Sequence, residues 1–237
     1  MQTAVSTDRK TRPELGEYQG VDCIRAKDGL LYAAAWNGAA LKKRTSDLVR
    51  TDGGHAAAIL SVEGELTGFA FDAAGDVWLT QLTTAGGTLC RAKHDSWGAA
   101  VEQVVTQLDG APLGAVSAVE VSPAGKAYFA VAAAAGAENG LESALRTELL
   151  AHTATGCVYV YDPAARTVEK VLGGVAGAAG LALSPDGSTL YVSDLGSRCI
   201  WAVDADAREL TAGGRGCTAA FAGLPGCLLY TSDAADE

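Results

Sequence analysis

Alternating apolar and polar residues recur four times along the chain, each time on both sides of a short turn that contains a glycine. The four segments are residues 23–32, 69–78, 119–128 and 181–191, with turn glycines at Gly29, Gly75, Gly125 and Gly187. A period of two on both sides of a tight turn is typical of a β-hairpin. A β-structured unit that recurs every ~40–50 residues predicts a β-propeller.

Further strand-like runs complete each unit. We predict third strands at residues 40–42, 88–90, 157–161 and 199–203, and outer strands at 101–108 and 167–172, with weaker ones at 47–50 and 217–222. A β-sandwich built from the same hairpins is the alternative. Four matching units in register favour the propeller, because a sandwich does not require them.

The third unit is interrupted by an alanine-rich insertion. Within it, residues 138–152 place Leu141, Leu145 and Leu149 four residues apart, on one face of a short helix. Such an insertion acts either as a lid over a cleft or as a helix that packs on the rim of the propeller. The sequence favours neither reading.

Composition narrows the functional classes. The 237 residues carry a formal net charge of −10, which argues against nucleic acid and anionic membrane surfaces as partners. No apolar run reaches the ~20 residues that span a bilayer. Residues 1–16 lack the apolar core of a signal peptide, so a cytoplasmic location is the default expectation.

Neither cysteine nor histidine forms a pattern of its own. The six cysteines include no CxxC pair, and those in strand-like runs are expected to be buried free thiols. His55, His94 and His152 are scattered singly, and we expect surface positions for them.

Three motifs in order resemble the strictosidine synthase family. They are residues 155–163 (TGCVYVYDP), 180–187 (GLALSPDG) and 221–226 (FAGLPG). The helical insertion also lies where that family interrupts its third blade. The resemblance implies a six-bladed propeller, related in fold to gluconolactonases and paraoxonases, of which about four blades are present in residues 15–226. Residues 1–14 are then a polar N-terminal segment.

The same resemblance implies that the chain is a C-terminally truncated piece, because the family continues with two further blades. Residues 227–237 match no propeller pattern, and we interpret them as a non-native tail. The acid/base glutamate of the family lies beyond this point. The resemblance therefore predicts an inactive fragment of an active parent protein.

Candidate site residues follow from comparing the positions just before the residue that opens each inner strand. They are Gln19, Thr67, Ser117 and Ala179, which would line the channel and contact a small-molecule substrate. In metal-dependent relatives the first, third and fourth positions would resemble Glu, Asn and Asn ligands of a divalent cation. Asp194 matches an acidic ligand of those relatives, although it can equally cap a turn with Ser197.

These residues disfavour calcium as a cofactor, and we expect the protein to have no cofactor. Hard cations need several oxygen ligands that include carboxylates, whereas Gln19 and Ser117 are neutral and Ala179 offers no side-chain oxygen. Three functions remain open. In the first, the parent protein is an enzyme that acts on a small organic molecule, as a hydrolase or an amine–aldehyde condensing enzyme. In the second, it is a non-catalytic propeller that binds a ligand or protein. In the third, it is a metal-dependent lactonase. The sequence does not indicate an oligomeric state.

Overall fold

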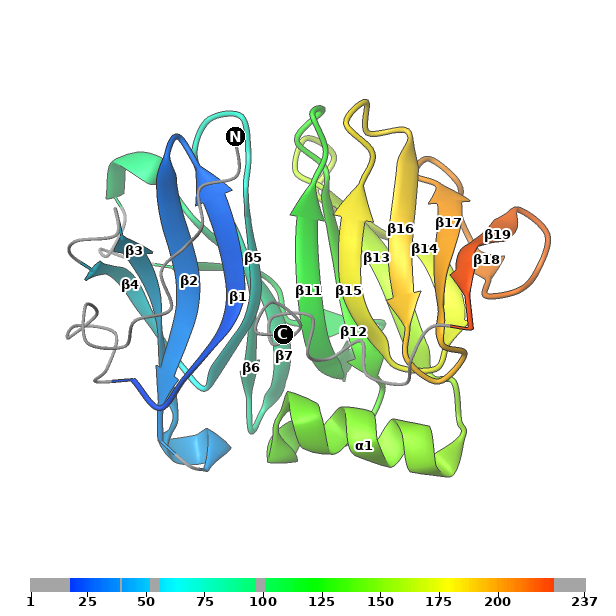
Figure 1. Ribbon diagram of the computed structural model, residues 1–237, viewed down its shortest axis with the longest axis horizontal. Coiled ribbons are helices and arrows are strands. Elements are labelled where there is room, and N and C mark those ends of the chain that lie inside the picture. Colours follow the sequence, from blue (N-terminus) through cyan, green and yellow to red (C-terminus); the bar gives the residue numbers. More distant parts are fainter. Residues whose placement is uncertain (1–17, 39, 52–55, 97–100, 224–237) are drawn as a thin grey trace.

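Four antiparallel sheets stand side by side in a computed structural model of the chain (Figure 1), which describes residues 18–38, 40–51, 56–96 and 101–223. Each sheet is one blade of a β-propeller, so the predicted fold is confirmed. The proposed boundary at residue 14 and the tail at 227–237 lie outside the described residues.

Blade 1 contains β1 (Gly20–Lys27), β2 (Leu30–Asn37), β3 (Thr45–Thr51) and β4 (Ala56–Glu63). Blade 2 contains β5 (Glu65–Phe71), β6 (Val77–Thr83), β7 (Gly86–Ala92) and β8 (Glu102–Val105). In both blades each strand pairs with the next along the chain. A short hairpin of β9 (Gln107–Leu108) and β10 (Ala111–Pro112) follows blade 2.

Blade 3 contains β11 (Ala115–Val121), β12 (Ala127–Ala133), β13 (Gly156–Asp162) and β14 (Thr167–Val175). A short strand, β18 (Leu210–Thr211), adds to β14 in parallel. Blade 4 contains β15 (Ala178–Leu183), β16 (Thr189–Asp194), β17 (Cys199–Asp204) and β19 (Cys217–Ala222).

The four repeated hairpins form the two innermost strands of the four blades. Asp28 and Gly29 form a two-residue turn in which both residues have positive φ, at 52° and 79°. In the other three turns the amide of the glycine donates to the carbonyl three residues earlier. Gly75, Gly125 and Gly187 have φ near +80°, a conformation that glycine adopts without steric cost.

The prediction for the outer half of blade 1 was wrong. Residues around 40–42 do not form its third strand, because Leu41–Lys43 is a 3-10 helix that begins the reversal after β2. The third strand is β3, which contains the residues 47–50 that we assigned to the outer strand. Leu41 packs inward from this turn, with 8% of its surface exposed, whereas Ala40 is exposed.

Buried side chains fill the spaces between neighbouring blades. One cluster around Phe69, Leu79 and Leu48 joins blades 1 and 2, and another around Trp78, Phe129 and Val116 joins blades 2 and 3. A third, which contains Tyr128, Val160 and Leu190, joins blades 3 and 4. Face-to-face packing of apolar sheet faces holds the blades together.

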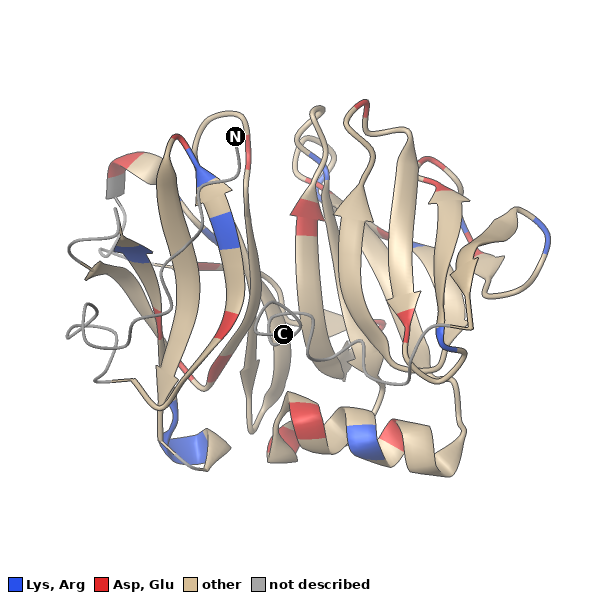
Figure 2. Cartoon of the chain, viewed as in Figure 1, with Lys and Arg blue, Asp and Glu red and all other residues tan. Residues whose placement is uncertain are grey.

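The predicted helical insertion is confirmed. A 3-10 helix (Ala137–Asn139) leads into α1 (Leu141–Ala151), which lies across the lower ends of the blade 3 strands in Figure 1. Figure 2 shows that α1 carries charges of both signs, while the strands of blade 4 are mostly uncharged. Among the described residues no helix is both long and apolar enough to cross a membrane.

Candidate functional site

The first strand of each blade is its innermost strand. β5 contacts β1 on one side and β11 on the other, and β11 also contacts β15, so these four strands lie in chain order around the centre of the fan. Each has one edge that is not paired within its own blade. Side chains and backbone groups at these edges therefore form the candidate site.

A β-bulge interrupts each inner strand near its start. The pairing register skips one residue at Thr67 in β5, at Ser117 in β11 and at Ala179 in β15. Three of the four positions selected from the sequence are thus structurally equivalent, and each is the extra residue of a bulge. Bulges redirect side chains and are frequent beside active sites.

Gln19 is not the equivalent residue in blade 1. The irregularity of β1 falls between Val21 and Ile24. Counting back from the hairpin turn makes Cys23 the residue of β1 that is equivalent to Thr67, Ser117 and Ala179 of the other blades. Gln19 precedes β1. Its side-chain carbonyl accepts a hydrogen bond from the amide of Gly38 at 3.0 Å, so it holds the connection after β2.

The hydroxyl groups at the bulges bind neighbouring strands. Ser117 is 3% exposed and donates to the carbonyl of Ala178 at 2.6 Å, which links β11 to β15. Thr67 lies 2.9 Å from the hydroxyl of Thr80 within blade 2. Ala179 packs against the apolar cluster under α1. These side chains stabilise the assembly of inner strands.

Asp194 ends β16 and is fully buried. One carboxylate oxygen accepts the amide of Ser197 at 3.0 Å, and the other accepts the indole N–H of Trp201 at 2.9 Å. Both oxygens therefore hold the turn between β16 and β17. This geometry matches the turn-capping interpretation of Asp194.

The four positions that resemble metal ligands do not fit a calcium site. Gln19 and Asp194 direct their oxygens at backbone or indole N–H groups, Ser117 directs its proton at a carbonyl, and Ala179 has no donor atom. A calcium ion needs six to eight oxygens, usually with carboxylates. Within the described ranges no three His, Cys, Asp or Glu side chains cluster at metal-binding distance.

A different pair of charged residues does meet across the inner strands. Arg25 of β1 reaches over β5 and forms an ion pair of 2.5 Å with Glu120 of β11. The same guanidinium lies 3.4 Å from the carbonyl of Val119, at the inner edge of β11. The side chains of Arg25 and Glu120 are 32% and 15% exposed, so the pair is partly accessible.

Burial alters the chemistry of this cluster. Desolvation raises the pKa of Glu120 above its ordinary value, and the opposing attraction of Arg25 only partly offsets it. Desolvation also raises the pKa of the Cys23 thiol, which lies beside Arg25, so Cys23 is a poor nucleophile at neutral pH. Glu120 is thus the candidate proton-transfer group and Arg25 the candidate anion-binding group.

Sequence reasoning missed all three members of this cluster. Cys23, Arg25 and Glu120 alternate with apolar residues in strands 1 and 11, where they read as ordinary polar positions of an inner strand. A signal did exist, because buried inner strands of a propeller rarely carry charges without partners. The two charges lie 95 residues apart, so only the fold brings them together.

The expectations for histidine and cysteine are partly tested. His94 and His152 are exposed, as expected, and His55 lies outside the described residues. The five described cysteines are free, and only Cys90 and Cys199 are fully buried. The thiol pKa of Cys90 is raised to about 12 by burial, which is typical of an inert structural cysteine.

Comparison with known proteins gives one family. Residues 87–228 match the SMP-30/gluconolactonase/LRE-like region, a match that spans more than half of the chain. No curated protein sequence matches the chain.

Solved structures share the fold at low identity. A luciferin-regenerating enzyme superposes with a TM-score of 0.58 at 17% identity, covering 86% of this chain and 61% of its own. A gluconolactonase from Xanthomonas campestris gives 0.52 at 18%, covering 82% and 71%. A chain of a nidogen/laminin complex gives 0.56 at 12%, covering 81% and 67%. The chain thus spans about two thirds of the length of these proteins.

Proposed function

The chain belongs to the SMP-30/gluconolactonase/LRE-like family, and from this premise we propose that it forms part of a propeller hydrolase that opens a small lactone or ester. The family match carries the proposal. The solved structures support a propeller fold and no particular substrate, because their identity with this chain is below 20%.

Arg25 and Glu120 are the residues to which we assign the chemistry. Glu120 would take a proton from water, whose oxygen then adds to the carbonyl carbon of the ester. The guanidinium of Arg25 would stabilise the oxyanion that forms there. When the carbon–oxygen bond to the leaving group breaks, Glu120 would return the proton to the departing alkoxide, which yields a hydroxy acid from a lactone. The raised pKa of Glu120 suits both proton transfers.

Hydrolysis of gluconolactone and phenyl acetate tests this assignment. We expect Glu120→Gln to lower kcat/KM by about 100-fold, the lower range for loss of a general acid/base. Glu63→Gln is the matched control, because Glu63 is exposed at the end of β4. Unchanged turnover in Glu120→Gln would remove Glu120 from the mechanism.

A metal-dependent lactonase is the alternative within the same family. It would need ligands other than the side chains of Gln19, Ser117 and Asp194, which are already hydrogen-bonded, and of Ala179, which has no donor atom. Calorimetry with calcium distinguishes the metal-independent hydrolase from the metal-dependent one, and we expect no saturable binding of calcium in the micromolar range. Activity abolished by a chelator and restored by calcium would favour the metal-dependent reaction.

A non-catalytic propeller that binds a ligand or protein is a second candidate. It is favoured because Thr67 and Ser117 at the bulges, and Asp194 at the end of β16, already make internal hydrogen bonds. Saturable binding of a substrate analogue without any turnover would support it.

The narrower resemblance to strictosidine synthases remains a proposal. Its motifs fall on β13, on β15 with its following turn, and on the end of β19 and residues beyond it. Strands and hairpin turns of this kind occur in propellers generally. Condensation of an aromatic amine with an aldehyde, assayed beside ester hydrolysis, distinguishes this activity from that of a hydrolase.

A further inference from the structure

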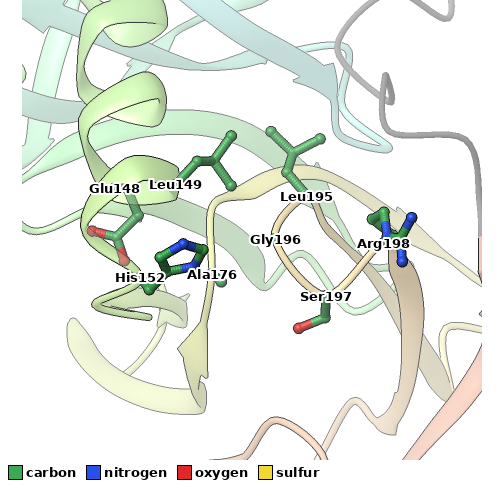
Figure 3. Close-up of a pocket in the computed structure, with 8 residues that line it drawn as sticks. All are labelled: Glu148, Leu149, His152, Ala176, Leu195, Gly196, Ser197 and Arg198. Atoms are coloured by element: carbon green, nitrogen blue, oxygen red, sulfur yellow. The ribbon is translucent and has the colours of Figure 1, made fainter.

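A cleft of about 430 Å³ opens between the C-terminal end of α1 and blade 4 (Figure 3). The last turn of α1, the connection between β14 and β15 at Ala176, and the β16–β17 turn at residues 195–198 form its walls. Leu149 and Leu195 give it an apolar side. The volume suits a small organic molecule.

Three side chains at this cleft can donate hydrogen bonds. His152, Ser197 and Arg198 are exposed, and none has a side-chain hydrogen bond or ion pair to any other residue that the structure describes. His152 ends the helix, whereas Ser197 and Arg198 lie on the opposing turn (Figure 3). His152 thus lines the cleft from the end of α1, and Ser197 and Arg198 line it from the β16–β17 turn.

The oxygens of the acidic residue in the cleft are already engaged in hydrogen bonds with neighbouring residues. Glu148 is 5% exposed, and its oxygens accept the hydroxyls of Thr153 and Thr155 at 2.8 and 2.7 Å and the amide of Thr155. In Figure 3 its carboxylate points away from the turn that carries Ser197. The cleft thus offers a guanidinium, an imidazole and a hydroxyl, with no free carboxylate to hold a cation.

Both walls are fixed before any ligand arrives. The amide of Gly196 donates to Ala176 at 2.8 Å, and Asp194 holds the turn through Ser197 and Trp201. On the other wall, Leu145 and Leu149 anchor α1 in the apolar cluster that also contains Ala179 of β15. A preorganised site binds more tightly because less motion is lost on binding.

We propose that this cleft binds a small organic carboxylate through Arg198, Ser197 and His152, with the carbon chain against Leu149 and Leu195. Guanidinium groups bind carboxylates with charge-assisted hydrogen bonds of matched geometry. The choice of a hydroxy acid as ligand rests on the proposed lactone hydrolysis, of which it is the product. The anion-binding site itself stands on the geometry of the cleft.

Titration calorimetry with gluconate, and with uncharged glucose for comparison, tests the site. We expect saturable binding of gluconate only, weakened about tenfold in Arg198→Asn, the loss of one charge-assisted hydrogen bond. His152→Asn should weaken it as well. Asparagine tolerates the left-handed backbone of both residues, with φ of 51° and 53°, so the fold is retained.

Arg166→Asn is the matched control. Arg166 is also an exposed arginine with a left-handed backbone (φ 56°), but it lies in the β13–β14 turn away from the cleft. Equal binding of glucose, no saturable binding of gluconate, or an equal loss in Arg166→Asn would each overturn the proposal. Lactone turnover in wild type with no binding of gluconate would refute this site alone, and binding without turnover would refute only the proposed hydrolysis.

Discussion

At the scale of single residues, the contact between Arg25 and Glu120 is the unusual feature of the inner strands. It joins β1 of blade 1 to β11 of blade 3, and it places two charges in a partly desolvated region. The Nε of Arg25 is buried and has no hydrogen-bond partner among the described residues. Removing two charges from water costs free energy, and an ion pair often does not repay that cost. Charged groups in such surroundings are frequently found at functional sites.

The raised pKa of Glu120 predicts how stability responds to pH. Folded Glu120 keeps its proton to a higher pH than the unfolded chain, whose value is near 4.5, so its contribution is fully present below that pH. The contribution is lost as the pH rises through the folded value. We therefore expect the unfolding free energy of wild type, relative to Glu120→Gln, to fall as the pH rises above about 4.5. Urea denaturation across this range measures it, and a difference that rises with pH would contradict the assignment.

Sequence reasoning found three of the four bulge positions because each directly precedes the small residue taken to open its inner strand. In blade 1 the same rule selected Gln19, before Gly20, and so it passed over Cys23, which lies further along β1. Bulges leave no mark in a pattern of period two beyond a slip of one residue. The partners of Ser117 and Asp194 could be assigned only when the strands were placed.

At the scale of elements, α1 connects distant parts of the fan. Its first amide, that of Leu141, donates to Glu65 of β5 at 2.8 Å, and Glu65 also forms an ion pair with Arg44 of blade 1. A carboxylate at this end of a helix is favoured by the helix dipole. Its other end forms the wall of the cleft beside blade 4. The helix thus packs over the ends of the strands, and in the same position it lines the cleft.

Two leucines of α1 give a matched test of this packing. Leu145 is 1% exposed within the cluster of Ala132 and Leu195, whereas Leu150 is 73% exposed. We expect Leu145→Ala to lower the unfolding free energy by about 2–4 kcal/mol, because it removes buried surface and leaves a cavity. Leu150→Ala should change it by less than about 0.5 kcal/mol. Equal effects in urea denaturation would show that α1 does not pack as described.

The elements were largely predictable because local signals agree with the fold. Hairpins with glycine turns and a helix with leucines at four-residue spacing carry their periodicity in the sequence. Blade 1 was the exception, since the apolar residues Ala40 and Leu41 resemble a strand yet belong to a turn from which only Leu41 packs inward. Tertiary packing decided that segment, as it often does for short apolar runs.

At the scale of the whole molecule, the fan has two outer faces that no other described blade covers. On blade 1, Ile24 is 56% exposed, while its neighbour Cys23 packs toward blade 2. On blade 4, Phe221 of β19 is 60% exposed. Exposed apolar positions on sheet faces and edges promote association with other sheets.

These faces predict concentration-dependent self-association of the 237-residue polypeptide. We expect the double variant Ile24→Thr and Phe221→Thr to shift the protein toward monomer, because threonine retains β-propensity while removing apolar surface. Analytical ultracentrifugation over a range of concentrations measures the shift, with Leu150→Gln as the control, since Leu150 is more exposed than either residue but lies on α1. If the control reduced association as much as the double variant did, general surface hydrophobicity would be responsible. If neither variant altered the sedimentation profile, the outer blade faces would not mediate contact between copies.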